Sequence, residues 1–330
     1  MMKRAAIAGK REAVLVDRPI PKPEGNEVLI KVHIAPMCTE YKMFLDGQPA
    51  DALGHEAVGE VVETAQDGPF KPGDRVVAMP LTGCGTCELC LSGDYIHCLD
   101  NPMKDATMSQ YVVKPAVCVR KIPDDIPYER AALACCGLGA SYGAIRKLGV
   151  SAYDTLLVTG LGPVGLGAVI NAKFCGARVI GVEMNPYRVE LARKLGIDAV
   201  IDPRDPDAVQ QIRALTGGVG PDCAIDCSGI PAAHRLCIDA VRRKGKVAFV
   251  GECHAETPIV VSRDMIRKGI HLIGSWHYNL NDYPDLMKVI RHSPLIDHFV
   301  THVFPMSRIQ EALEVSASQQ CAKILLKPWE

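Results

Sequence analysis

The segment TLLVTGLGPVG, residues 155–165, is the most informative one for the fold of the second half of the chain. An apolar run typical of a buried strand ends in Gly160-Leu161-Gly162-Pro163-Val164-Gly165, and the apolar stretch Leu166–Cys175 then predicts a helix. In such a strand–turn–helix, Gly160 allows a tight turn, Gly162 lets the backbone approach a pyrophosphate, and Gly165 packs helix against strand. The helix N-terminus attracts the anion. The segment therefore predicts a dinucleotide-binding site.

Apolar runs recur from residue 154 onward and alternate with stretches of helical character. Six strand–helix repeats of this kind predict a parallel, doubly wound sheet, which is an α/β fold. The six predicted strands are Thr155–Thr159, Arg178–Val182, Ala199–Ile201, Cys223–Asp226, Lys246–Val250 and Ile270–Gly274.

An acidic residue, Glu183, follows the second predicted strand, 23 residues after Gly160 (183 minus 160). A carboxylate at this place can accept hydrogen bonds from the adenosine ribose hydroxyls of a dinucleotide, and it would repel a 2′-phosphate. Glu183 therefore favours NAD over NADP. Arg188 follows closely, and an arginine there can accommodate the phosphate, so both residues are candidates for cofactor binding.

Four cysteines stand close together in GCGTCELCLSGDYIHC, residues 83–98. Cys84, Cys87, Cys90 and Cys98 are separated by two, two and seven residues. Four thiolates at this spacing can close the tetrahedral coordination sphere of one Zn²⁺. Buried thiols or disulfides are the alternative, but the spacing is typical of a metal site. Because a closed site leaves no open position for chemistry, we expect this zinc to be structural.

The composition limits the classes of protein to which the chain can belong. Its 330 residues suffice for about two domains. A formal net charge of -1 argues against nucleic acid or an anionic membrane as the main partner. No apolar stretch approaches the ~18 residues of a membrane span, and the N-terminus lacks the apolar core of a signal peptide. With fourteen cysteines, the sequence predicts a cytoplasmic protein rich in thiols and metal ligands.

The first third of the chain is predicted to consist of strands and turns, because apolar residues alternate or form short runs between glycines and prolines. The short C-terminal tail is expected to return to the first domain. The predicted elements outside the doubly wound sheet are strands at Val28–Ile34, Ala57–Val62 and Arg75–Met79, a helix from Tyr128 to Leu148, and a final helix and strand at Met306–Ser316 and Ala322–Leu326.

Three further places carry residues that bind metals. Cys38 follows a predicted strand, His55-Glu56 follows a glycine, and Cys135-Cys136 opens a glycine-rich stretch. Two thiolates and one imidazole suit a zinc ion that keeps a fourth position open. Taken alone, Cys38 is more often a small buried core residue. His55 alone is also explained as a hydrogen-bonded polar residue, and Cys135 or Cys136 as a core residue. The metal-site interpretation rests on their combination with the four cysteines and the dinucleotide motif.

With these motifs combined, the chain resembles the zinc-dependent medium-chain dehydrogenases, the family of alcohol, sorbitol and threonine dehydrogenases. The resemblance covers nearly the whole chain. It is carried by Cys38, Gly54–Gly59, Lys71–Val76, the four-cysteine segment, Gly160–Gly165 and Phe304-Pro305. It implies a GroES-like, mostly-β catalytic domain at 1–148 with a structural zinc lobe at about 83–99, a Rossmann NAD-binding domain at 149–284, and a C-terminal return to the catalytic domain at 285–330.

The resemblance also implies roles for individual residues. The residues that match Cys38 and His55 bind the catalytic zinc in this family, and the residue that matches Glu56 lies beside the metal and can bind it transiently. The third fixed ligand is Cys136 when the chain is counted back from Tyr142. The pattern of the polyol enzymes points to Cys135 instead, and we prefer Cys136.

The sequence departs from the family pattern two residues after Cys38. A serine or threonine usually begins a proton relay there, whereas this chain has Glu40, preceded by Thr39. Glu40 could itself accept the proton if its carboxylate lies within about 3 Å of the reacting group. The alternatives are that Glu40 is a structural carboxylate, or that Tyr41 provides the hydrogen bond.

The cofactor's nicotinamide end is also assigned by resemblance. Main-chain groups at Ser275 and His277 are expected to meet the carboxamide, and Val250 is expected near the same ring.

The predicted activity is hydride transfer between NAD and a small alcohol or its carbonyl product, with two zinc ions per chain. The expected substrate is a polar secondary alcohol such as a polyol, sugar, cyclitol or amino alcohol, and the family suggests a homodimer or homotetramer. One alternative is an NADPH-dependent aldehyde reductase, against which Glu183 argues. Another is a non-catalytic nucleotide-binding or redox-sensing homologue, but such a protein would not need the whole set of residues at 38, 55, 56 and 136.

Overall fold

The computed structural model describes residues 1–101 and 106–330. Contacts divide the described chain into two units. The first contains Met1–Cys136, Asn279–His292 and Val300–Glu330, and the second contains Gly137–Tyr278 and Ser293–Phe299. These limits differ from the domain limits expected from the sequence, which placed the first boundary after residue 148 and the second after 284. The helix between 139 and 148 packs against α5 (Pro163–Phe174) of the second unit, which explains the earlier boundary.

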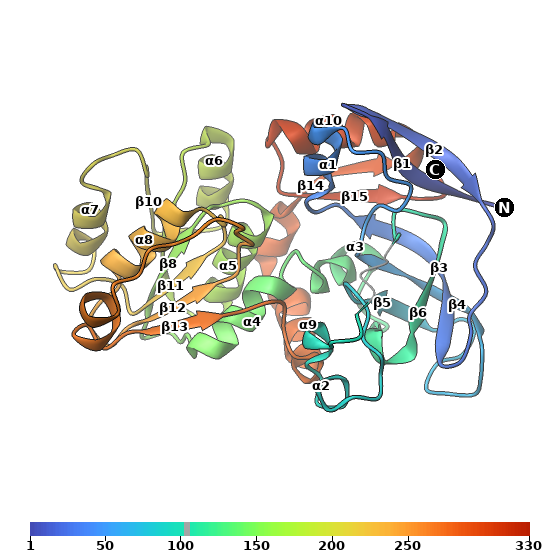
Figure 1. Ribbon diagram of the computed structural model, residues 1–330, viewed down its shortest axis with the longest axis horizontal. Coiled ribbons are helices and arrows are strands. Elements are labelled where there is room, and N and C mark those ends of the chain that lie inside the picture. The colour runs from blue at the N-terminus through green and yellow to red at the C-terminus, as the bar shows by residue number, and fades with distance from the viewer. Residues whose placement is uncertain (102–105) are drawn as a thin grey trace. The chain divides into compact units, whose positions relative to one another are not determined.

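The first unit is built on a seven-stranded sheet with the order β14-β15-β3-β4-β5-β7, in which β6 also pairs with β3 (Figure 1). Val28, Ile30 and Val32 of β3 are buried, as their period-2 spacing predicts, but Leu29 on the alternate face is buried as well. A separate hairpin is formed by β1 and β2. The strands are β1 (Met2–Gly9), β2 (Glu12–Arg18), β3 (Glu27–Pro36), β4 (Ala57–Thr64), β5 (Arg75–Ala78), β6 (Tyr111–Pro115), β7 (Val119–Lys121), β14 (Val300–Pro305) and β15 (Lys323–Lys327).

Short helical segments lie between these strands along the chain. The tail returns to this unit, because β15 pairs with β3 in an antiparallel register that sets Leu325 against Pro36. The helical segments are α1 (Glu40–Asp46), α2 (Glu88–Leu91), α3 (Tyr128–Ala131), α9 (Tyr283–His292) and α10 (Ile309–Ser318), with the 3-10 turns η1 (Tyr95–His97), η2 (Ala116–Cys118), η3 (Ala132–Ala134), η5 (Leu280–Asp282) and η7 (Met306–Arg308).

The second unit is the predicted doubly wound sheet. Its six strands are all parallel and have the order β10-β9-β8-β11-β12-β13 (Figure 1). The strands are β8 (Thr155–Thr159), β9 (Arg178–Val182), β10 (Ala199–Ile201), β11 (Cys223–Asp226), β12 (Lys246–Phe249) and β13 (His271–Gly274). The α/β fold class predicted from the sequence is confirmed.

Helices α5, α6 and α8 of the second unit each begin with a proline, at Pro163, Pro186 and Pro231. Proline suits the first helical position because its ring presets φ and its missing N–H has no intrahelical partner there. The helical segments of this unit are α4 (Gly139–Leu148), α5 (Pro163–Phe174), α6 (Pro186–Lys194), α7 (Ala208–Ala214), α8 (Pro231–Ala240), the π-helix η4 (Val261–Ile266) and the 3-10 turn η6 (Pro294–His298).

The prediction of one helix from Tyr128 to Leu148 is wrong. The chain forms α3 and η3, leaves the helix at Cys135 with ψ of -135°, and begins α4 at Gly139. The break frees the N–H of Cys136 from helical bonding, and this group donates to Glu56 Oε2 at 2.9 Å instead. The apolar periodicity is the same on both sides of the break, so the pattern alone does not reveal it.

Each unit has its own apolar core. In the first, residues such as Val32, Phe44 and Leu326 pack together, and in the second Leu157, Ile180 and Val247 do so. Among the helices of the described residues, none has the length and apolar character that a membrane crossing requires.

Candidate functional site

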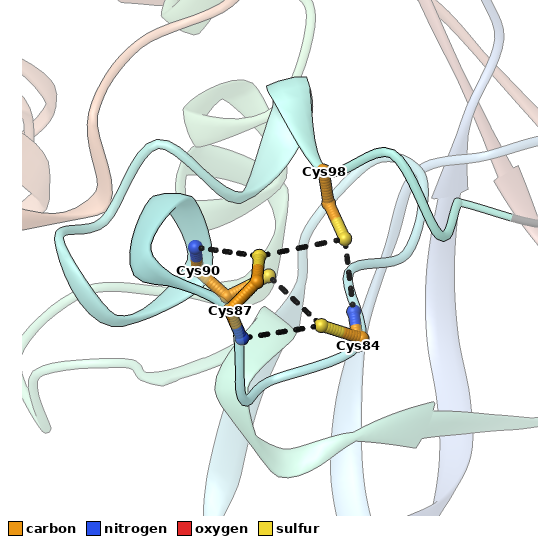
Figure 2. Close-up of side chains that lie close together, drawn as sticks. All are labelled: Cys84, Cys87, Cys90 and Cys98. Atoms are coloured by element: carbon orange, nitrogen blue, oxygen red, sulfur yellow. Dashed lines mark hydrogen bonds between the residues drawn. The ribbon is translucent and has the colours of Figure 1, made fainter.

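The four cysteines of the segment 83–98 converge around one point (Figure 2). Cys84 Sγ lies 4.0 Å from Cys90 Sγ, and Cys87 Sγ lies 3.8 Å from Cys98 Sγ. Ligands 2.3 Å from a tetrahedral zinc would place their sulfurs about 3.8 Å apart, whereas a disulfide needs about 2.05 Å. The quartet therefore fits a zinc ion and does not fit disulfides.

Local backbone geometry brings these sulfurs together. Cys87 precedes α2, and its Sγ accepts a hydrogen bond from the N–H of Cys90. Cys84 Sγ accepts from the N–H groups of Thr86 and Cys87 at 3.5 and 3.3 Å. Hydrogen bonds from the side chain and the backbone of Thr86 lower the pKa of the Cys84 thiol to about 6. N–H donors of this kind stabilise the thiolate form, which is the form that binds zinc.

A second cluster gathers the other predicted ligands within the first unit. One ligand atom from each of Cys38, His55, Glu56 and Cys136 lies within 4.8 Å of the others. His55 Nε2 is 3.2 Å from Cys136 Sγ, close to the about 3.5 Å expected for nitrogen and sulfur ligands of one tetrahedral zinc. Cys38 follows β3, His55 and Glu56 precede β4, and Cys136 follows η3. The donor set of two sulfurs, one nitrogen and one carboxylate therefore fits zinc.

Of the two adjacent cysteines, only Cys136 belongs to this cluster. The Sγ of Cys135 points elsewhere and lies 3.6 Å from the carbonyl oxygen of Ala78. Burial raises the pKa of the Cys135 thiol well above its usual value, as expected for a thiol in the apolar core. The geometry therefore favours Cys136 over Cys135 as the third ligand.

Glu40 is buried at the start of α1 and contacts two members of the cluster, Cys38 and His55. Its Oε2 accepts a hydrogen bond from the N–H of Cys38 at 2.7 Å, and its Oε1 is 3.3 Å from His55 Nδ1. A carboxylate can only accept, so it keeps the imidazole proton on Nδ1 and leaves Nε2 for a metal. Both carboxylate oxygens are thus engaged with two predicted ligands.

Glu56 is completely buried and pairs with a residue that the sequence did not point to. Its Oε1 lies 2.7 Å from the Nζ of Lys323 on β15, which is itself buried. Burial raises the pKa of Glu56 to about 7, although the Lys323 ammonium acts in the opposite direction. Lys323 was missed because a single lysine in a tail strand carries no sequence signal, and its partner lies 267 residues away.

The glycine motif stands at the turn from β8 to α5, as predicted. Gly160 has φ of +78°, a conformation that favours glycine. A Cβ on Gly165 would lie 1.9 Å from the carbonyl oxygen of Gly160, so helix and strand can approach this closely only without a side chain. A Cβ on Gly162 would meet nothing closer than the Arg188 guanidinium at 3.8 Å.

Glu183 and Arg188 lie beside this turn. The Glu183 carboxylate accepts hydrogen bonds from the N–H groups of Leu161, Met184 and Asn185, at 2.8–2.9 Å. A carboxylate has about four acceptor sites, so one remains for a further donor. Arg188 Nη1 is 4.0 Å from Glu183, and its buried Nε has no hydrogen-bond partner among the described residues. The open space at Gly162 and this free N–H fit an anionic dinucleotide.

The three residues expected near the nicotinamide lie at the ends of β12 and β13. Val250 donates its N–H to Asp226, and Ser275 donates its N–H to Phe249. His277 has φ of +56°, an uncommon backbone conformation for a residue other than glycine.

Comparisons with known proteins identify the family of the chain. Residues 24–124 match the model of the alcohol dehydrogenase GroES-like domain, and residues 163–292 match that of the zinc-binding dehydrogenases. The chain is 32% identical to a sorbitol dehydrogenase of Bacillus subtilis over 352 aligned positions, which cover 99% of this chain and 97% of the relative. It is 31% identical to an L-threonine 3-dehydrogenase of Caldanaerobacter subterraneus, with 97% and 96% covered.

The solved structure of an alcohol dehydrogenase from Thermus sp. ATN1 superposes with a TM-score of 0.91 at 25% identity, covering 99% of both chains. Sequence and structure therefore agree over the whole length. The chain belongs to the zinc-dependent medium-chain dehydrogenase family.

Proposed function

We propose that the protein is a zinc-dependent oxidoreductase that transfers a hydride between NAD and a polar secondary alcohol. The observation that carries this proposal is the cluster of Cys38, His55, Glu56 and Cys136, whose donor atoms lie within 4.8 Å of one another. The glycine motif between β8 and α5 supplies the second requirement, a place for a dinucleotide.

The ligands of the catalytic zinc are Cys38, His55 and Cys136, and Glu56 can bind the same ion as a further ligand. When bound, zinc supplies a Lewis acid that eases loss of the hydroxyl proton, and NAD supplies the hydride acceptor. The quartet of Cys84, Cys87, Cys90 and Cys98 binds a second zinc that stabilises its lobe.

Glu40 and Lys323 act through the ligands. Glu40 fixes the ring orientation and tautomer of His55, which is the usual task of a carboxylate behind a metal-binding histidine. Lys323 holds the buried Glu56 carboxylate and offsets its charge. With both its oxygens directed at Cys38 and His55, Glu40 is better placed for this positioning role than for accepting a substrate proton.

The relatives guide the choice of substrate class. The names sorbitol dehydrogenase and L-threonine 3-dehydrogenase both indicate hydroxyl-bearing substrates with further polar groups. We take a polyol, sugar, cyclitol or amino alcohol as the substrate class. NAD is the preferred cofactor because the Glu183 carboxylate would repel a 2′-phosphate.

We also propose a cytoplasmic homodimer or homotetramer. All fourteen cysteines lie in the described part of the chain and none of them forms a disulfide, which suits a reducing compartment. For assembly, β13 is an edge strand of the parallel sheet, and an unpaired edge is a template for strand pairing. Ile273→Lys on this strand should then reduce the mass that light scattering measures for the native protein.

Metal analysis and a panel of alcohols test the proposed function. The purified protein should contain two zinc ions per chain and reduce NAD with one or more polyols or amino alcohols, measured by the absorbance of NADH. Turnover should fail with Cys38→Ser. A protein with one zinc when fully loaded, or one that turns over only with NADP, would contradict the proposal.

A further inference from the structure

A buried carboxylate stands at the end of β11 and has no part in the function described so far. Asp226 is the last residue of this strand and is completely buried. Its Oδ1 accepts hydrogen bonds from the hydroxyls of Thr159 and Ser228 at 2.7 and 2.6 Å. Its Oδ2 accepts from the N–H of Gly229 at 2.9 Å and lies 3.1 Å from His234 Nε2. A satisfied buried network of this kind rigidifies the segments that contribute to it.

His234, on α8, connects this carboxylate to the segment that follows β12. The histidine is only 7% exposed, and its Nδ1 lies 2.6 Å from Thr257 Oγ1. Because an ionised carboxylate can only accept, Nε2 is the donor to Asp226. The Thr257 hydroxyl is the hydrogen-bond partner of Nδ1. A chain of hydrogen bonds thus runs from Asp226 through His234 to Thr257.

The segment 250–257 is therefore attached to β11 at two places. At its start, Val250 and Gly251 donate their N–H groups to the carbonyl oxygen of Asp226 at 2.9 and 3.0 Å. Further along the segment, the attachment is made by side chains. The Thr257 hydroxyl bonds to the His234 ring, and that ring bonds to the Asp226 carboxylate. The second attachment can be removed by substitution without altering the first.

The network occupies the point of the sheet where strand order reverses. β8 and β11 are neighbours, with β9 and β10 on one side and β12 and β13 on the other (Figure 1). Ligands of open parallel sheets bind at the carboxyl ends of the strands at such a reversal. Thr159 and Asp226 are the last residues of these two strands. Ser228 also packs on the glycine motif, since a Cβ on Gly160 would lie 2.8 Å from that of Ser228.

We propose that His234 is a positioning residue for the dinucleotide. The chain Asp226–His234–Thr257 holds the segment 250–257 in place beside the carboxyl ends of β8 and β11, so that this segment is ordered before the cofactor binds. The inference rests on the proposed function, since it takes NAD as the ligand of this unit. When these hydrogen bonds are lost, cofactor binding must also order the segment 250–257. The entropic cost of this ordering weakens the affinity for the cofactor.

Two substitutions remove different hydrogen bonds of the Asp226–His234–Thr257 network. Thr257→Val keeps the shape and removes the hydroxyl, while Thr257→Ser restores the hydroxyl alone. His234→Leu removes both hydrogen bonds of the ring. A matched control is Ser141→Ala, because the Ser141 hydroxyl is also buried in this unit but bonds to Leu138 and Asn171. NADH affinity is measured by fluorescence titration, kcat at saturating NAD by turnover, and thermal stability by circular dichroism.

We expect Thr257→Val and His234→Leu to raise the Kd for NADH about tenfold, the effect of losing one or two buried hydrogen bonds. Thr257→Ser should restore the parent Kd, zinc content should stay at two, and kcat should change much less than KM for NAD. Ser141→Ala should lower stability without changing Kd. Because Thr257 lies in a partly exposed segment, Thr257→Val should fold even if His234→Leu does not.

The inference is overturned if Thr257→Val binds NADH within about twofold of the parent, because His234 would then serve packing alone. It is also overturned if Thr257→Ser fails to restore affinity. Failure of the unaltered protein to bind NADH is a separate result, which sinks the proposed function itself.

Discussion

Glu40 Oε1 lies 3.3 Å from His55 Nδ1, and the second oxygen of the same carboxylate accepts the N–H of Cys38. One buried side chain thus contacts two predicted metal ligands that come from different segments of the chain. Glu40 occupies the position where the family usually has the hydroxyl of a proton relay. Substitution of Glu40 therefore distinguishes positioning of the zinc ligands from proton transfer.

Glu40→Ala should weaken zinc binding at the catalytic cluster by about 10–100-fold, the usual cost of losing a carboxylate behind a metal-binding histidine. Competition with a chromogenic chelator measures this affinity, and the zinc of the cysteine quartet should remain. Asp46→Asn, at the exposed end of the same helix, is the control and should change nothing. If Glu40→Ala instead lowers kcat/KM with zinc affinity intact, Glu40 serves proton transfer.

Lys323→Met should destabilise the first unit by about 3–5 kcal/mol, because it leaves the buried Glu56 carboxylate without its partner. Denaturant unfolding of the zinc-loaded protein measures the change. Lys121→Met is a matched control, since Lys121 pairs with Asp74 at 2.8 Å but is half exposed, and such a pair is worth about 0–1 kcal/mol. Adding Glu56→Gln to Lys323→Met should recover part of the loss, and no recovery would argue against the ion pair as the cause.

The two zinc sites should respond differently to loss of one sulfur. Cys38→Ser should remove one zinc and abolish turnover with little effect on folding. Cys90→Ser should remove the other zinc and destabilise the lobe, because a structural zinc contributes folding energy. Elemental analysis and thermal unfolding give both readouts. Cys175→Ser, outside both clusters, should keep two zinc ions, and a loss of zinc there would undermine the assignment.

Glu183→Ala should weaken NAD binding and reduce the preference for NAD over NADP by about tenfold or more. Part of the effect comes from the turn itself, since Glu183 accepts the N–H groups of Leu161, Met184 and Asn185. The ratio of kcat/KM for the two cofactors measures discrimination. Glu190→Ala, an exposed acidic residue on the following helix, should leave that ratio unchanged.

Features encoded by neighbouring residues could be predicted from the sequence. The turn at Gly160–Gly165 depends on glycines within one strand–helix connection, and the parallel sheet that it predicts is confirmed. The cysteine quartet likewise depends on spacing within sixteen residues, 83–98, and its sulfurs do converge.

Features that depend on distant partners could not be predicted in the same way. Lys323 meets Glu56 only because β15 returns to pair with β3, and nothing near residue 323 indicates it. The direction of the Glu40 side chain depends on where His55 lies, which tertiary packing decides. The helical pattern from 128 to 148 does not show the break at Cys135, beyond which the Cys136 N–H bonds to Glu56, a partner 80 residues away.

The return of β15 also sets the order in which the two metal sites can mature during synthesis. The quartet is complete once Cys98 has emerged, whereas the other cluster gains the ammonium that neutralises its carboxylate only when Lys323 is made. The interval is 225 residues (323 minus 98), or on the order of ten to forty seconds at about 5–20 residues per second. A nascent chain can thus load its lobe early, while the carboxylate of the second cluster gains its ion-pair partner only when β15 is made.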